Sequence, residues 1–134
     1  MYRHAMLGSA IVEARLPTRD LARARRWYSD KLGLEPVEER DGGLRYEGQA
    51  GVFCLFASAG SSDGSFTQMA FDVDDIEATV AGLKARGVAF EEYPGCINSI
   101  MDIEGNYPSK GSGERAAWFR DSEGNLLGIA QVQP

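Results

Sequence analysis

The chain has 134 residues, 43% of them hydrophobic and 25% charged, which is typical of one globular domain. Its net charge of -6 argues against a nucleic-acid partner, because phosphate binding requires a basic surface. No apolar run is long enough for a membrane span or a secretory leader. Cys54 and Cys96 lie outside any CxxC motif, which excludes a zinc ribbon and indicates reduced thiols. We therefore predict a cytoplasmic protein with no nucleic-acid or membrane partner.

The first half of the chain predicts a strand, a helix and three more strands. Residues 9–16 alternate between polar and apolar side chains up to Pro17, which is typical of a strand. A helical periodicity follows, with Thr18 or Asp20 as its cap and Gly33 as its left-handed stop. The further strands are expected at 34–40, 44–47 and 52–57.

The second half predicts the same order after a Gly/Ser-rich linker at 59–65. Residues 66–73 alternate like a strand, and Asp74 begins a capping-box-like sequence for a helix that ends at Gly87. The segment 94–113 is rich in Gly, Ser, Asn and Pro and is long for a loop, which is typical of a lid or binding loop. The remaining strands are expected at 88–93, 116–120 and 126–132.

The two halves match each other in sequence. Aligning Asp20 with Asp75 brings Gly33 against Gly87 after a shift of one residue. A repeat of about 55 residues is too long for a solenoid unit and short for an independent domain. It predicts two half-modules, 9–58 and 66–134, within a single domain that spans 1–134 and offers a ligand site at their shared interface.

Several short motifs occur in order along the chain: Asp20-Leu21, Trp27-Tyr28, Leu32-Gly33-Leu34, 73–76, 84–88 and 118–125. Together they resemble the vicinal oxygen chelate superfamily, which includes glyoxalase I, bleomycin resistance proteins, fosfomycin resistance enzymes and extradiol dioxygenases. The resemblance covers the chain from Ile11 to Gln131. It implies an α+β fold in which two βαβββ modules form a curled mixed sheet, a cup-shaped barrel that binds a small molecule. It also implies a homodimer.

Enzymes of this superfamily usually hold a divalent metal ion in the cup. The resemblance places the four ligand positions at Glu13, Cys54, Gln68 and Gly128. Glycine supplies no side-chain ligand, and a carboxylate, a thiolate and an amide mix hard and soft donors that no common metal prefers. The single histidine, His4, lies outside the motif. We therefore expect no metal ligands and no cofactor, and metal-dependent catalysis is disfavoured.

Strand parity predicts which side chains line the cup if Glu13 faces inward. The set mixes aromatic, apolar and polar groups, as a small-molecule pocket does. Gly128 would open space, Trp118 and Phe56 could stack on a planar ligand, and the loop at 94–113 could close over the top. The predicted ligand-binding residues are Arg15, Cys54, Phe56, Gln68, Asp72, Met101, Tyr107, Trp118, Arg120 and Gly128.

Each polar candidate has a structural alternative. Glu13 is a candidate general base with a raised pKa, or else forms a salt bridge with Arg15, Arg45 or Arg120. Cys54 is a candidate nucleophile or a small buried thiol. Gln68 would bind a ligand or bond to its neighbours in the strand.

Three functions are compatible with this pattern. The first is a binding protein of the bleomycin resistance type with a degenerate metal site, which takes up an amphipathic metabolite or antibiotic; the acidic balance favours a cationic ligand. The alternative is a lyase, isomerase or dioxygenase that uses Glu13 as a base or a non-standard metal site. The third is a non-catalytic dimeric interaction module.

Overall fold

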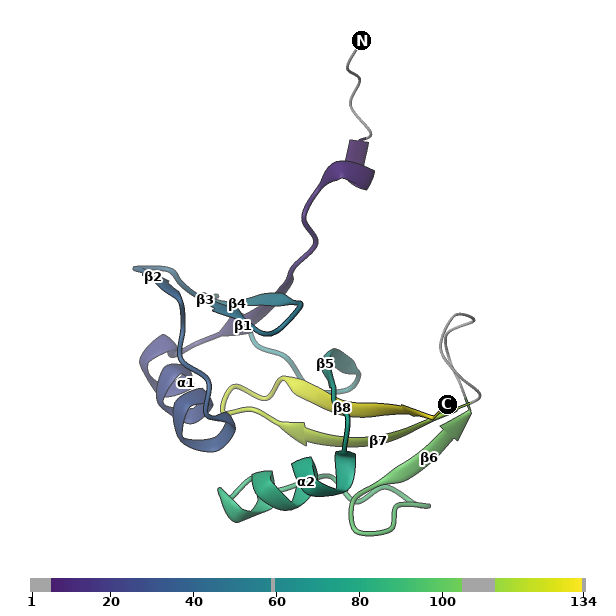
Figure 1. Cartoon of the computed structure of the whole chain (residues 1–134). Coiled ribbons are helices and arrows are strands. Elements are labelled where there is room, and N and C mark those ends of the chain that lie inside the picture. The colour runs from purple at the N-terminus through teal and green to yellow at the C-terminus, as the bar shows by residue number, and fades with distance from the viewer. Residues whose placement is uncertain (1–5, 59, 105–112, 134) are drawn as a thin grey trace.

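The computed structural model describes residues 6–58, 60–104 and 113–133. The chain forms two four-stranded sheets, with α1 against one face of the first sheet and α2 against one face of the second (Figure 1). An N-terminal arm that includes the short 3-10 turn η1 (Met6–Ser9) projects away from them. None of the described helices is long and apolar enough to cross a membrane.

The first sheet has the strand order β1-β4-β3-β2, with β1 parallel to β4 and the other pairs antiparallel. The second sheet repeats this topology in the order β5-β8-β7-β6. The predicted α+β fold of two βαβββ modules is therefore confirmed, and the sheets curl without closing into a barrel. The strands are β1 (Ala14–Thr18), β2 (Glu38–Arg40), β3 (Gly43–Glu47), β4 (Val52–Ala57), β5 (Thr67–Asp72), β6 (Met101–Glu104), β7 (Gly113–Arg120) and β8 (Leu126–Gln133).

The two helices begin in the same way, as the repeat predicts. Asp20 caps α1 (Leu21–Trp27), and Asp75 caps α2 (Ile76–Ala85), each through its side chain and with extended backbone. The predicted cap at Asp74 is thus wrong by one residue. A π-helical turn, η2 (Tyr28–Leu32), continues α1 up to Gly33, which has φ 69° and ends the helix in the left-handed conformation.

Pro17 lies inside β1 and does not end it, contrary to prediction. Among the described strands, β1 exchanges ladder hydrogen bonds with β4 alone, so it is an edge strand of its sheet. An edge strand tolerates proline because one row of its backbone groups has no ladder partner.

The prediction fails most in the stretch between α2 and β7. The expected strand at 88–93 is reduced to one bridge between Phe90 and Phe119, whereas the expected loop contains β6. The physical reason is that β7 has eight residues and pairs with β6 only along its first half, which leaves its second half to Phe90. Between the two pairings the chain makes an excursion with a tight turn at Asn98 and Ser99, where φ is 53° and 71°.

One continuous aromatic core joins the two halves. Tyr46 stacks on Phe53 at 4.9 Å between ring centroids, and Phe53 meets Phe71 of the second half edge-on at 6.1 Å. Trp27 of the first helix stacks on Phe119 of β7 at 6.1 Å. Because the two halves share these buried rings, each needs the other to keep its core out of water.

Candidate functional site

The first sheet has one buried face and one open face. On β4, Phe53 and Leu55 point into the core, so their neighbour Cys54 points to the opposite side. The strand register places Arg15 and Arg45 directly beside Cys54, on either side of it. This row on the open face is the centre of the candidate site.

Glu13 contacts three of these side chains. Its carboxylate accepts from Arg45 Nη1 at 2.9 Å and pairs with Arg15 Nη2 at 3.1 Å, and the Cys54 thiol lies 3.6 Å from Oε1. Desolvation acts to raise the pKa of Glu13, but the Cys54 hydrogen bond and the two guanidinium charges outweigh it and lower the pKa below its usual value. The predicted raised pKa is therefore wrong, and the salt bridge foreseen as the alternative is present to two of the three arginines.

Cys54 has the opposite electrostatic character. Burial, followed by the neighbouring Glu13 carboxylate, raises the pKa of its thiol above the ordinary value. Since the thiolate is the nucleophilic form, this environment favours an unreactive thiol. The structural alternative for Cys54 is thus the one that the geometry supports.

A cavity of about 280 Å³ opens on the same face. Its lining includes the predicted residues Arg15, Cys54 and Phe56, and Phe56 keeps 37% of its surface exposed. The remaining lining residues are Glu38, Arg40, Gly42, Gly43, Leu44, Arg45 and Leu55. Arg40 was not predicted, and Arg45 was expected only as a salt-bridge partner of Glu13, because the sequence does not show that β2 and β3 complete this face.

Trp118 lies on the open face of the second sheet. Its indole N–H donates to the Thr67 hydroxyl at 3.1 Å, and its ring meets Tyr93 edge-on at 5.4 Å. A side chain at Gly128 would come within 3.5–3.6 Å of Thr67, Ala70 and Trp118. The space that Gly128 was predicted to leave for a ligand is therefore bounded closely by these side chains.

Gln68 is engaged within the protein. Its Nε2 donates to Asn125 Oδ1 at 3.0 Å, and its Oε1 accepts from the backbone N–H of Leu126 at 3.2 Å. The pairing of β5 with β8 shifts register directly after Thr67, which brings the Thr67 side chain beside Trp118. The structural alternative for Gln68 matches this geometry, and Thr67 is the residue that the parity argument missed.

Arg120 secures the linker between the halves. It donates from Nη1 to the Asp63 carbonyl oxygen at 3.2 Å and from Nε to Glu91 at 3.4 Å. Its guanidinium packs on Gly64, where an added Cβ would lie 1.7 Å from Nη1. The donors of Arg120 that make these contacts are thus bound within the protein.

The other predicted residues are dispersed. Asp72 is exposed at the end of β5, and Met101 lies in β6, where it lines a separate cavity of about 440 Å³ with Ile97 and Arg115. Tyr107 lies outside the described residues. Met101 is thus part of a sheet and not of the predicted closing loop.

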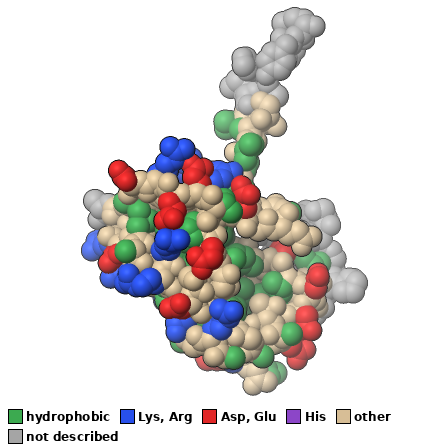
Figure 2. Space-filling model, turned by 60° about the vertical axis from the view of Figure 1, so that its left-hand side comes forward, with side chains coloured by type: hydrophobic (Ala, Val, Ile, Leu, Met, Phe, Trp, Pro, Cys, Tyr) green, Lys and Arg blue, Asp and Glu red, His purple; other side chains and the backbone are tan. Residues whose placement is uncertain are grey.

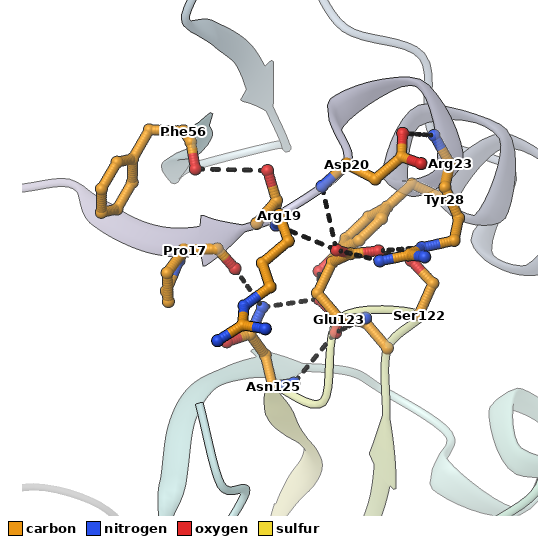
Figure 3. Close-up of polar contacts among 11 residues, drawn as sticks. Pro17, Arg19, Asp20, Arg23, Tyr28, Phe56, Ser122, Glu123 and Asn125 are labelled. Atoms are coloured by element: carbon orange, nitrogen blue, oxygen red, sulfur yellow. Dashed lines mark hydrogen bonds and ion pairs between the residues drawn. The ribbon is translucent and has the colours of Figure 1, made fainter. Parts of the chain in front are cut away.

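A polar network that the sequence did not predict ties the β7–β8 turn to α1 (Figure 3). The Glu123 carboxylate accepts from Arg23 Nε and Nη2, both at 2.8 Å, and from the backbone N–H groups of Arg19 and Asp20 at 3.1 and 3.3 Å. Its side chain is only 2% exposed. These bonds, led by those from Arg23, lower the pKa of Glu123 to about 2.

Asp121 anchors the same turn from inside. It accepts from the Tyr28 hydroxyl at 2.6 Å and from the Asn125 side chain at 2.9 Å, while Asn125 also donates to the Pro17 carbonyl oxygen at 3.1 Å. Burial and the Asp121 charge raise the pKa of Tyr28 well above its usual value. The network is structural, since these contacts join the first half of the chain to this turn or close the turn itself.

The residues at the four superfamily ligand positions do not fit a divalent metal ion. Both carboxylate oxygens of Glu13 face arginines, the Gln68 amide is engaged in the turn, and Gly128 has no donor atom. Within the part of the chain that the structure describes, no three His, Cys, Asp or Glu side chains gather at one point.

Comparison with known proteins places this geometry in context. The family model described as Glyoxalase/Bleomycin resistance protein/Dioxygenase superfamily matches residues 10–129. No curated protein matches the chain in sequence.

Solved structures with the same fold cover nearly the whole chain. A protein from the mobile metagenome of V. Pseudocholerae is 19% identical, with a TM-score of 0.68 over 94% of this chain and 96% of that one. A glyoxalase/bleomycin resistance protein/dioxygenase from Alicyclobacillus acidocaldarius is 14% identical, with a TM-score of 0.69 over 94% and 93%. TnmS3, an antibiotic binding protein from Streptomyces sp. CB03234, is 22% identical, with a TM-score of 0.64 over 98% and 100%.

Proposed function

Because the chain belongs to the glyoxalase/bleomycin resistance protein/dioxygenase superfamily, we propose that it binds an amphipathic small molecule, a metabolite or an antibiotic, without a bound metal ion. The observation that carries this proposal is a lined cavity beside a ligand set that does not fit a metal. A neighbour of the same fold is described as an antibiotic binding protein, which supports the same class of ligand.

The open faces supply the contacts that such a ligand needs. Phe56 offers a partly exposed ring at the cavity, and Trp118 offers an indole on the second sheet. Arginine side chains beside Phe56 supply directional polar contacts. Apolar walls with a few fixed polar groups are typical of small-molecule sites.

Binding is best tested by titrating the protein with a panel of amphipathic metabolites and antibiotics in a calorimeter. Trp118 adds an optical signal, because the second tryptophan, Trp27, is packed against the core. We expect saturable heat together with a fluorescence change that Trp118→Phe abolishes. Phe56→Ala should weaken binding, whereas Phe66→Ala, at a ring that is 64% exposed outside the sheets, should not. A panel with no saturable binding would contradict the proposal.

The enzymatic alternative depends on Glu13 as a base. Its lowered pKa keeps it ionised at neutral pH, but the arginine pairs make it a weaker proton acceptor. If a reaction is found, Glu13→Gln should abolish turnover while the fold survives. A stoichiometric divalent metal in protein purified without chelators would favour this alternative over simple binding.

We also propose that the protein is a cytoplasmic homodimer. The arm before β1 carries Leu7, Ile11 and Val12 with 82–88% of their surfaces exposed, and apolar side chains of this kind gain from being covered. Light scattering after chromatography should give the mass of two chains, and Ile11→Ser with Val12→Ser should shift the equilibrium towards one. A monomeric mass for the unaltered chain at high concentration would refute the dimer.

A further inference from the structure

Two rows of side chains cross the open face of the first sheet. The strand register places Arg15, Cys54, Arg45 and Glu38 side by side on β1, β4, β3 and β2. Neighbouring strands lie about 4.8 Å apart, so these side chains form one continuous line across the sheet. The line places the small Cys54 thiol between two arginines, and Glu38 follows at the edge.

The adjacent row contains a gap. It runs Pro17, Phe56, Gly43, Arg40 in the same strand order. Gly43 therefore leaves no side chain between the Phe56 ring and the Arg40 guanidinium. The cavity of about 280 Å³ is lined by residues of both rows, which supply the apolar Phe56 ring as well as charged side chains.

The charged side chains that line the cavity are mostly arginines, although carboxylates of Glu13, Glu38 and Glu47 pair with them. Three arginines, Arg15, Arg40 and Arg45, line the cavity together with the single carboxylate of Glu38. Basic and acidic side chains are intermixed over the part of the molecule from which the arm leaves (Figure 2).

The arginines are held in place and still have donors to offer. Arg45 is oriented by Glu13 at 2.9 Å and by Glu47 at 3.5 Å. Arg15 pairs with Glu13 at 3.1 Å and Arg40 with Glu38 at 2.5 Å, and these two arginine side chains are 69% and 80% exposed. A guanidinium has five N–H donors, so one carboxylate partner does not exhaust it. Exposed ion pairs are also weak, and an incoming anion can compete with them.

We propose that the cavity recognises a planar aromatic carboxylate, with the arginines on the carboxylate and Phe56 on the ring. The inference rests on the proposed binding function and names its ligand class. Arginine is suited to this role because its planar fork matches a carboxylate with two parallel hydrogen bonds. The gap at Gly43 gives the flat ring room beside Phe56.

The test uses three probes of nearly equal shape: 2-naphthoate, its neutral amide and the cationic 2-naphthylmethylamine. Calorimetry on the full chain should show binding of the carboxylate at least about tenfold tighter than either analogue, since charge-assisted hydrogen bonds are the stronger ones. Raising the salt concentration should weaken the binding of the carboxylate and leave the binding of the amide unchanged.

Variants locate the effect. Arg15→Gln and Arg40→Gln alter exposed side chains that the fold does not need, and each should weaken naphthoate binding about fivefold or more. Arg26→Gln, exposed on α1, is the matched control and should leave binding unchanged. Phe56→Ala should weaken the binding of the carboxylate and of the amide to the same extent.

The outcomes separate this inference from the binding function. If the amide or the amine binds as tightly as naphthoate or more tightly, and Phe56→Ala abolishes this binding, the proposed ligand class is wrong. The proposed binding function would then still stand. Naphthoate binding that survives both Arg15→Gln and Arg40→Gln would also overturn it. If single-ring and fused-ring carboxylates all fail while other compounds of the panel bind, the ligand class is wrong; if the whole panel fails, both proposals are wrong.

Discussion

Replacing Glu123 with glutamine should remove much of the stability that joins the β7–β8 turn to α1. The carboxylate is almost fully buried and accepts four hydrogen bonds from α1 and the residues before it. Glutamine keeps one acceptor oxygen but turns an amide N–H group towards these donors. The variant therefore loses the ionic contact with Arg23 and gains a mismatch at the backbone.

The magnitude follows from the pKa of Glu123. The folded protein lowers that pKa from 4.5 to about 2, mainly through the hydrogen bonds from Arg23. A fall of about 2.5 units corresponds to at most about 3.4 kcal/mol of stability. Because the Arg23 side chain is 49% exposed and partly screened by solvent, we expect about 2–3 kcal/mol. As the folded pKa is the lower one, this stability is complete above the unfolded pKa of 4.5 and is lost as the pH falls to about 2.

Urea denaturation measured from pH 7 down to pH 2.5 gives the free energy of unfolding for each variant. The difference between the unaltered protein and Glu123→Gln should be constant at neutral pH and shrink steadily below about pH 4.5. Glu39→Gln is the matched control, because Glu39 pairs with Arg25 of the same helix but is 53% exposed, and it should cost no more than about 0.5 kcal/mol. Equal costs for the two variants, or a difference that does not depend on pH, would refute the reasoning.

Two further pairs of variants test the buried network and the backbone by the same measurement. Tyr28→Phe removes a buried hydroxyl that donates to a carboxylate and should lower the free energy of unfolding by about 1–2 kcal/mol. Tyr46→Phe should be neutral or slightly stabilising, because the buried Tyr46 hydroxyl has no hydrogen-bond partner among the described residues. A larger loss for Tyr46→Phe than for Tyr28→Phe would contradict this. Gly64→Ala should cost about 2 kcal/mol or more, since φ is +69° and the new methyl would overlap Arg120, whereas Gly82→Ala, with open space on α2, should gain about 0.5–1 kcal/mol. Similar values for the two glycine variants would show that neither the backbone angle nor the overlap matters.

The repeat in the sequence predicted what local chemistry controls. Asp20 and Asp75 cap their helices at equivalent positions, and Gly33 and Gly87 follow those helices with positive φ. These features depend on a few neighbouring residues, so one sequence is enough to find them. The parity of β4 was equally accessible, because Cys54 and Phe56 alternate with buried neighbours.

What the sequence could not give depends on contacts between distant segments. The hydrogen bond from Tyr28 to Asp121 joins residues 93 positions apart, and nothing in the type of either residue predicts the other as its partner. Residues 121–125 were expected only to connect two strands, although the carboxylates of Asp121 and Glu123 also hold the first helix. The choice between the two roles of Gln68 could not be made, because a one-residue slip in pairing, as occurs here between Thr67 and Met69, exchanges the faces of a strand. Neither Arg40 nor Arg45 was predicted to line a cavity, because only the register of β2, β3 and β4 brings them together.

The interrupted pairing along β7 has a consequence for how this fold can diversify. One half of β7 is bridged at Phe90 and the other half pairs with β6. Of the ten described residues 91–100 between these pairings, only Glu91 forms a backbone hydrogen bond with β7, from its N–H to the Trp118 carbonyl oxygen. Ser99 and Ile100 are buried, whereas residues 94–98 are mostly exposed. Insertions or deletions within 94–98 would therefore lengthen or shorten a surface excursion and leave the ladder on either side in register. The molecule thus keeps a place, next to the open face that carries Trp118, where new segments can be tried without rebuilding the scaffold.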